Sequence, residues 1–374
     1  MLLEEVCAVI AGDRARAERQ ARMTPEVRAA ASEAGLFTLA APREVGGREL
    51  DLVELVSTFE RLGYADPAFS WSAMNSIGTG LMAAKLSERA REPVFAQLDG
   101  PYGLAAALTY SQAQQVEGGW QIEGDWRFMT GSCDARWCTV WTLDPTSEAP
   151  NVLWMVLPMD QLEVTDTWLD ASSMRGTGSN AVRAAGLFVP AERVVEMKQP
   201  PLIDRPLYRV DPRIMIFAPS AALVIGALRC AIDGLVELAG PKLSNAPGRP
   251  RHADSWRVQQ GVCDATAAVD CLSAGLASLM AEVWSHAEAA TPAPPELRAR
   301  WWSILCYLLD TARRHVSDLY SLSTSAAYAT DNRVERSFRD IHAVATTFEM
   351  LPVQAFRGAS GLVLLGHDPA NPAF

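Results

Sequence analysis

Two short segments of the sequence combine hydroxyl side chains with glycine: Phe128-Met-Thr-Gly-Ser132 and Arg175-Gly-Thr-Gly-Ser-Asn180. Hydroxyl groups and the backbone amides of glycine-rich turns can hydrogen-bond to a ligand. The second segment lacks the lysine of the GxxxxGK[ST] phosphate loop, which excludes a nucleoside triphosphate site of that kind. Both segments can also be β-turns supported by Gly, Thr and Asn, and the residues alone leave this alternative open.

The other groups that could do chemistry are scattered along the chain. The five histidines lie far apart and no HExxH spacing occurs, so we expect no metal site. The seven cysteines contain no CxxC pair, and their odd number argues against a disulfide framework. We therefore expect a cytoplasmic protein with reduced, mostly buried thiols.

The composition narrows the class of partner. The 374 residues are 49% hydrophobic and 21% charged, which is usual for a globular protein and excludes collagen-like or disordered chains. The net charge is −11 and no basic face is concentrated, so we expect no nucleic-acid partner. The first residues lack the basic region of a signal peptide, and no apolar run reaches the roughly 18 residues of a membrane span. We therefore expect no membrane partner.

Three regions differ in their hydrophobic pattern. Residues 1–100 are predicted to be a helical domain, with a helix start at Thr24-Pro25 and further helices over 52–62 and after Asp66-Pro67. Residues 101–212 are predicted to be a central antiparallel β domain, a barrel or sandwich. There Trp120 to Phe128 alternates apolar and polar residues after a Gly118-Gly119 hairpin turn. Further strands are expected at 137–143, 152–157 and 184–189.

Residues 213–374 are predicted to form a four-helix bundle, with helices over 220–239, 253–283, 295–323 and 334–348. The fold class is therefore α+β, mainly α, in the order helical domain, β domain, helical bundle. Ligand sites favour the junctions between domains, so we expect a site at one of them.

Five groups of segments resemble the acyl-CoA dehydrogenase superfamily, and most closely its branch of group D flavin-dependent monooxygenases. They are EAGLF at 33–37 with PREVGG at 42–47, DPAFSW at 66–71, VEGGWQIEGDWRFMTGS at 116–132 with DARW at 134–137, MRGTGSN at 174–180 with FVPAER at 188–193, and TSAAY at 324–328 with RSFRD at 336–340. Each segment alone is a weak signal. Their shared order and spacing indicate the acyl-CoA dehydrogenase-like fold, usually a homotetramer or homodimer with a flavin between the β domain and the bundle.

The resemblance implies a set of flavin-binding residues. Phe128, Thr130, Gly131 and Ser132 match the segment that meets the isoalloxazine ring, where the Thr130 hydroxyl or a backbone amide would bond to N5. Thr324 and Ser325 stand where dehydrogenases carry a Gly-Gly turn near the flavin phosphates. Arg257 and Gln260 match bundle positions that reach the flavin of a neighbouring subunit. The alternatives are a strand end, a helix cap and a solvated helix face.

The acid–base position of the family is altered. Phe348 stands where dehydrogenases carry a catalytic Glu, and Glu349 is one residue further, about 100° round a helix. His342 matches a histidine that is frequent in this helix, so His342 and Glu349 are the candidate acid–base residues. The residues expected to line the substrate pocket are Trp71, Asn75, Tyr110, Ser179 and Phe348. For the aromatic ones, ordinary core packing is the alternative.

The dehydrogenase flavin loop is also replaced, by TYSQAQQ at 109–115. We therefore expect a monooxygenase that uses reduced flavin (FAD, or FMN as a reduced co-substrate) and O2. Its substrate would be aromatic or hydrophobic, free or linked to CoA or a carrier, and a separate flavin reductase would be a partner. The alternatives are an acyl-CoA dehydrogenase-like enzyme and a catalytically silent partner subunit of the same fold.

Overall fold

A computed structural model describes residues 1–97, 99–105, 111–148, 151–243, 248, 250–350 and 353–368, and leaves out the side chains of 348–350 and 353–355. The chain forms two compact units. The first contains residues 1–51 and 68–216, and the second contains residues 52–67 and 217–374. The predicted division into three domains, at residues 100 and 212, stays a prediction.

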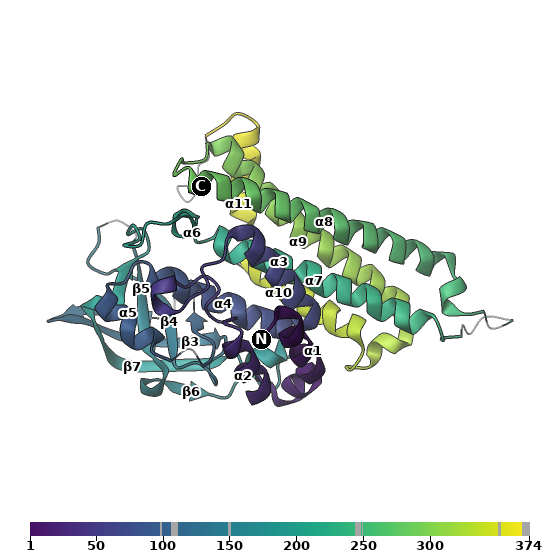
Figure 1. The fold of residues 1–374 in the computed structure, drawn as a ribbon, viewed down its shortest axis with the longest axis horizontal. Helices are drawn as coiled ribbons and strands as arrows, with labels where there is room; N and C mark the ends of the chain where they lie inside the picture. The colour runs from purple at the N-terminus through teal and green to yellow at the C-terminus, as the bar shows by residue number, and fades with distance from the viewer. Residues whose placement is uncertain are drawn as a thin grey trace. The chain divides into compact units, whose positions relative to one another are not determined.

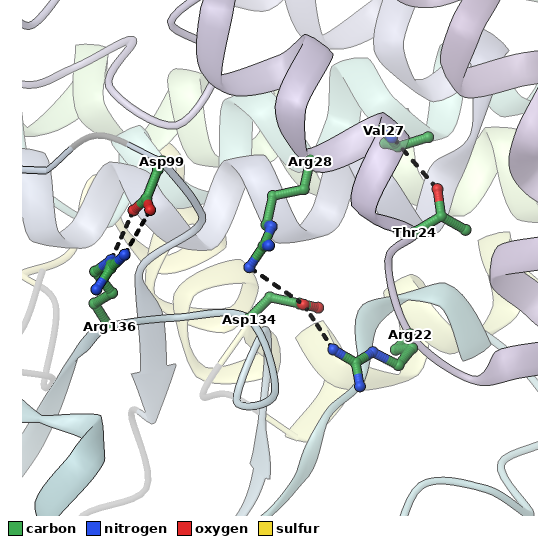
Figure 2. Close-up of polar contacts among 7 residues, drawn as sticks. All are labelled: Arg22, Thr24, Val27, Arg28, Asp99, Asp134 and Arg136. Carbon is green, nitrogen blue, oxygen red and sulfur yellow. Dashed lines mark hydrogen bonds and ion pairs between the residues drawn. The ribbon is translucent and has the colours of Figure 1, made fainter.

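The first unit contains four helices that precede its strands and one short helix that follows them. They are α1 (Leu3–Gln20), α2 (Pro25–Glu33), α4 (Pro67–Ala83), α5 (Glu88–Phe95) and, after the strands, α6 (Pro206–Arg209). The predicted helix start at Thr24 is confirmed, because its side chain accepts a hydrogen bond from the Val27 amide at 3.4 Å and Pro25 is the first helical residue (Figure 2). A capped start fixes the end of the α1–α2 connection, which lies beside the candidate site described below.

The strands of the first unit form two four-stranded sheets. One has the order β1 (Gly103–Ala105), β4 (Trp137–Leu143), β5 (Val152–Pro158), β8 (Val194–Glu196), and the other has the order β2 (Ser111–Val116), β3 (Gly119–Met129), β7 (Asn180–Pro190), β6 (Glu163–Thr165). Residues such as Ile122 and Trp126 on one sheet and Val140 and Met155 on the other are fully buried in a shared core. A bridge between Leu104 and Thr130 joins the edge of β1 to the end of β3.

The strands predicted at 120–128, 137–143, 152–157 and 184–189 are confirmed as β3, β4, β5 and β7, and the predicted hairpin turn joins β2 to β3. The expectation of a wholly antiparallel domain was wrong at one edge, because β1 pairs with β4 in parallel. Strands β1, β6 and β8 are three residues long, too short to show an alternating pattern.

The second unit is a helical bundle. It contains α3 (Leu52–Ala65), α7 (Ile214–Ala239), α8 (Trp256–Glu288), α9 (Pro295–Ser323), α10 (Arg333–Met350) and α11 (Val353–Leu364), with the 3-10 turn η7 (Thr324–Tyr328) after α9. The four long helices predicted for this region are confirmed as α7 to α10, and α8 and α9 run side by side along their length (Figure 1). Helix α3 also packs in this unit although it lies early in the sequence.

Helices α7 and α8 are each long and apolar enough to cross a membrane by length and composition alone. In α7, 89% of the most apolar window is buried inside the protein, which is the pattern of a core helix. In α8 the buried share is 28%. The expectation of no membrane partner stays a prediction.

Helices α3 and α7 approach closely because both carry glycine at the crossing. A Cβ atom on Gly63 would overlap the carbonyl oxygen of Leu223, and one on Gly226 would overlap that of Glu60. Gly226→Ala must therefore force the two backbones apart, and we expect the free energy of unfolding to fall by about 2 kcal/mol in urea denaturation.

Gly275→Ala is the matched control, because no atom lies within 4 Å of a Cβ placed at this position of α8. Alanine there should leave stability unchanged or raise it by up to about 1 kcal/mol through helix propensity. An equal decrease in the free energy of unfolding for Gly226→Ala and Gly275→Ala would contradict the close approach of α3 and α7.

Candidate functional site

The structure brings the two hydroxyl- and glycine-containing segments together in the first unit. Strands β3 and β7 are paired up to Met129 and Asn180, so the turn after one strand meets the turn before the other. The Gly131 amide donates to the Thr177 carbonyl at 2.9 Å, and the Ser132 hydroxyl donates to the Gly178 carbonyl at 2.8 Å. The Asn180 amide also donates to Ser132 Oγ at 3.3 Å, and nothing in the sequence indicates this contact between residues that are 48 positions apart.

Four polar side chains form a connected chain at this junction. Trp71 Nε1 on α4 donates to Thr130 Oγ1 at 3.2 Å, and Thr130 Oγ1 lies 3.1 Å from Ser179 Oγ. Ser179 Oγ in turn lies 2.7 Å from Thr177 Oγ1. The three hydroxyl residues are each at most 4% exposed, so the chain is shielded from water. Buried hydroxyl groups are stable only when hydrogen-bonded, which the chain achieves.

Phe128 adopts an unusual conformation next to this chain. Its φ is +62°, in the left-handed region that costs a non-glycine residue about 1 kcal/mol or more, and its side chain is 64% exposed. Its ring meets the Trp168 ring edge-on, with centroids 6.0 Å apart. Strained backbone conformations cluster at ligand-binding sites, and the predicted role of Phe128 at a flavin ring stays a prediction.

Asn180 holds the neighbouring loop in place. Its Oδ1 accepts from the backbone amides of Thr167 and Trp168 at 2.9 and 3.0 Å, and its Nδ2 donates to Cys133 Sγ at 3.0 Å. Trp168 is thereby fixed beside Phe128. Sequence reasoning noted Asn180 only as a turn residue, because its three partners lie 12 to 47 residues away.

Arg175 anchors the second turn to the neighbouring backbone. Its guanidinium donates to the carbonyls of Glu18, Leu169 and Ala171 at 2.9, 2.6 and 2.7 Å, which ties the turn to the end of α1. The planar guanidinium can satisfy several carbonyls at once, which a lysine ammonium cannot do with the same geometry.

Ion pairs surround the loop that follows Ser132 (Figure 2). The Asp134 carboxylate is nearly buried and lies 3.0 Å from Arg22 and 3.9 Å from Arg28. The hydrogen bond to Asp134 raises the pKa of Arg22. Arg136 donates two hydrogen bonds to the Asp99 carboxylate, from Nε to Oδ1 at 2.8 Å and from Nη2 to Oδ2 at 2.7 Å. These bonds lower the pKa of Asp99. The loop is thus anchored to the α1–α2 connection on one side and to the α5–β1 connection on the other.

A cavity of about 530 Å³ opens beside the same loop. Its walls include Gln97, Ser132, Arg136, Trp137, Met159 and Asp160. Ser132 is the predicted site residue that lines it. The predicted pocket residue Ser179 lies instead in the hydroxyl chain.

The other predicted pocket residues of the first unit differ in outcome. Trp71 is half-buried and belongs to the hydroxyl chain. Asn75 is buried and its Nδ2 donates to the Trp71 carbonyl at 2.8 Å, one helical turn earlier. Tyr110 lies outside the described residues.

In the second unit, Thr324 also adopts a conformation typical of glycine. It ends α9 with φ 56° and ψ −144°, which fits the position where dehydrogenases carry glycine. Lys242 Nζ donates to Thr324 Oγ1 and to the Ser323 carbonyl, the latter at 3.1 Å. A cation beside a hydroxyl group fits the predicted role of Thr324 and Ser325 near a phosphate. Sequence reasoning missed Lys242, because 82 residues separate it from Thr324.

The remaining predicted residues of this unit lie on helices. Arg257 and Gln260 are exposed near the start of α8, where they are accessible to a ligand or a second subunit. His342 Nε2 on α10 lies 3.0 Å from Ser317 Oγ, and the ring packs against Phe338. Phe348 and Glu349 lie near the end of α10, and their side chains are outside the described part. The roles of all these residues stay predictions.

Among the described residues, no group of three or more His, Cys, Asp or Glu could hold a metal ion. The seven cysteines are free, but the expectation that most are buried was wrong: Cys138, Cys230 and Cys306 are buried, whereas Cys133, Cys263 and Cys271 are exposed. Cys263 and Cys271 lie on the exposed face of α8. A hydrophobicity pattern does not distinguish small residues on such a face from small residues in a core.

One unit that combines helices with two β-sheets, and a second unit that is a helical bundle, are the organisation of the acyl-CoA dehydrogenase class. Known proteins agree. The acyl-CoA dehydrogenase N-terminal domain matches residues 2–98 and the C-terminal domain matches residues 218–351. The chain belongs to the acyl-CoA dehydrogenase superfamily, in its branch of flavin-dependent monooxygenases.

Individual relatives support this branch. A pigment production hydroxylase from Rhodococcus sp. is 28% identical to this chain, and the matched part covers 83% of this chain and 81% of the hydroxylase. The oxygenase subunit HsaA of a flavin-dependent monooxygenase from Rhodococcus jostii is 24% identical, with 84% of each chain covered. The fold itself is shared with the structure of XiaF from Streptomyces sp. in complex with FADH2, which has a TM-score of 0.88 at 23% identity over 99% of this chain and 95% of that one.

The anchoring of the second turn can be tested at Arg175. In Arg175→Lys the ammonium can replace only part of the three carbonyl contacts, and we expect the free energy of unfolding to fall by about 1–2 kcal/mol. Urea denaturation measures this. Arg183→Lys, an exposed position on the neighbouring β7, is the control and should change stability by less than about 0.5 kcal/mol. If Arg183→Lys lowers the free energy of unfolding as much as Arg175→Lys does, Arg175 is not the anchor of the second turn.

Proposed function

We propose that this protein is the oxygenase component of a two-component flavin-dependent monooxygenase. It receives reduced flavin, FADH2 or reduced FMN, from a separate reductase and hydroxylates a small aromatic or hydrophobic substrate. In the overall reaction, reduced flavin, O2 and the substrate C–H give oxidised flavin, water and the substrate C–OH. One oxygen atom enters the product, and the flavin supplies the two electrons that reduce the other.

The observation that carries this proposal is the junction of the two turns. Thr130 and Ser179 present hydroxyl groups in a buried environment, and Phe128 stands exposed beside them on a strained backbone. A flavin ring needs such a combination, because its polar edge needs hydrogen bonds and its faces need apolar contacts. Taken by itself, the second unit holds Lys242 beside Thr324, and a cation next to a hydroxyl group suits a phosphate.

The chain's residues would bind, orient and shield rather than carry out acid–base chemistry. Reduced flavin reacts with O2 through its own chemistry, so the protein must exclude water and place the substrate. Abstraction of an α-proton by a dehydrogenase would need a carboxylate at the position that Phe348 occupies. His342, held by Ser317, is the residue we assign as acid–base partner for a phenolic substrate.

The finer features belong to the same proposal. The substrate is free or linked to CoA or a carrier, and the enzyme works in the cytoplasm, with which the free cysteines agree. We propose a homotetramer or homodimer, in which the exposed Arg257 and Gln260 of one subunit reach the flavin of another. Size-exclusion chromatography with light scattering tests the assembly.

The function is tested by loading the purified protein with photoreduced FAD or FMN under anaerobic conditions, and then adding ¹⁸O2 and a panel of phenols and aromatic acids. We expect a product that carries one ¹⁸O atom, detected by mass spectrometry. Thr130→Val should raise the Kd for flavin about fivefold, because it removes a hydrogen bond worth about 1 kcal/mol.

Two outcomes would contradict this function. Loss of flavin absorbance on addition of acyl-CoA alone, without a reductant, would identify a dehydrogenase. Failure to bind FAD or FMN in either redox state would leave a catalytically silent subunit of the same fold. Thr58→Val on α3, which removes a hydroxyl bonded within its own helix, is the control for Thr130→Val and should leave the flavin Kd unchanged.

A further inference from the structure

An irregularity in strand pairing pushes Phe128 out of the β core. From Trp126 to Met129, β3 advances by three residues, while the paired stretch of β7 advances by only two. The extra residue is a β-bulge, and it shifts the alternation of side chains by one position. Trp126 and Met129 are fully buried, whereas Phe128 between them is 64% exposed. Met129 therefore takes the inward place that a regular strand would give to Phe128.

Folding alone does not explain the conformation of Phe128. An exposed ring gains little from the hydrophobic effect, and the φ of +62° is strained for a residue that has a side chain. The ring contacts Trp168, but more than half of its surface stays open, so this contact does not recover the lost burial. Strain of this kind clusters at sites that receive a ligand, and a ligand reaches an exposed ring directly.

The neighbouring ring, that of Trp168, is held at both ends. The Trp168 backbone amide donates to Asn180 Oδ1 at 3.0 Å, and the indole Nε1 donates to the Met174 carbonyl at 3.3 Å. The indole ring therefore cannot rotate without losing a hydrogen bond. It meets the Phe128 ring with centroids 6.0 Å apart and planes 81° apart, which is the edge-to-face geometry that aromatic pairs favour. Trp168 is thus a fixed surface against which the Phe128 ring is oriented.

We propose that Trp168 is a positioning residue, which holds the Phe128 ring in the orientation that receives the isoalloxazine ring of the flavin. This inference rests on the proposed function, in which Phe128 contacts the flavin. Without its neighbour, the exposed side chain of Phe128 would populate several rotamers, and binding would have to select one of them. Trp168 removes much of that entropic cost in advance. It acts through Phe128 and does not itself contact the flavin.

This role predicts a loss of flavin affinity that depends on Phe128. In Trp168→Leu, which removes the ring and keeps an apolar side chain, we expect the Kd for FMN to rise about fivefold. Phe128→Ala removes the flavin contact itself and should raise the Kd at least as much. In the Phe128→Ala background, Trp168→Leu should change the Kd by less than about twofold, because no ring is left to position. Trp168→Phe keeps an aromatic contact and should bring the Kd to within about twofold of wild type.

The experiment measures flavin affinity rather than turnover. The full-length protein is titrated with FMN, both oxidised and reduced by dithionite under anaerobic conditions, for wild type and each variant. The fluorescence of bound oxidised FMN is a second readout, because stacking of an aromatic side chain on the flavin ring quenches it. The fluorescence should increase in Trp168→Leu, and Trp168→Phe should restore the quenching. Thermal denaturation establishes that each variant is folded, and Trp168→Met replaces Trp168→Leu if the latter does not fold.

Trp141→Leu is the matched control. Trp141 is a half-buried tryptophan of β4, and its ring meets the Trp154 ring at 6.1 Å and 82°, nearly the geometry of the Trp168 pair. Its replacement should lower the thermal stability and leave the Kd for FMN unchanged.

Three results would overturn the positioning role of Trp168 while leaving the proposed function intact. The first is an unchanged Kd in Trp168→Leu. The second is an equal rise of the Kd in Trp141→Leu. The third is a fivefold rise caused by Trp168→Leu in the Phe128→Ala background as well, because Trp168 would then act independently of Phe128. Failure of wild-type protein to bind flavin in either redox state would instead overturn the proposed function and this inference together.

Discussion

The structure of the candidate site depends on one constraint: two turns must meet face to face where the pairing of β3 and β7 ends. Gly131 and Gly178 adopt φ values of 75° and 55°, which lets each turn reverse next to the other. The Gly131 amide and the Ser132 hydroxyl then bond to carbonyls across the junction. With the turns locked in this way, Thr130 and Ser179 are placed within hydrogen-bonding distance.

Burial makes this junction demanding. Hydroxyl groups removed from water must find partners, so the side chains that meet here are required to form a connected network. Arg175 and Asn180 satisfy nearby backbone groups, and the ion pairs of Asp134 hold the following loop. The strain at Phe128 persists because these surroundings fix it. The result is a rigid polar edge beside an exposed aromatic ring, which is the site that we propose for the flavin.

The sequence predicted the elements well and the contacts poorly. Alternation revealed β3, and long apolar periodicity revealed α7 to α10, because these patterns repeat over many residues. The three-residue strands, and the parallel pairing of β1 with β4, have no local pattern. Thr130, Ser179 and Thr324 were predicted as site residues through resemblance to a family, whereas Lys242 and the anchoring role of Asn180 were not predicted. Their partners are distant in sequence, and hydrogen bonds of that kind are decided by the tertiary fold.

The most direct test of this account is hydrogen–deuterium exchange with and without reduced flavin under anaerobic conditions. We expect the peptides covering residues 128–132 and 175–180 to become protected together, because both turns form one flavin-binding edge. The peptide around Thr324 should follow, since it is assigned to the phosphate. The assignment of this junction as the flavin site would be contradicted if only one of the two peptides became protected from exchange. It would also be contradicted if neither peptide became protected at flavin concentrations that saturate the protein.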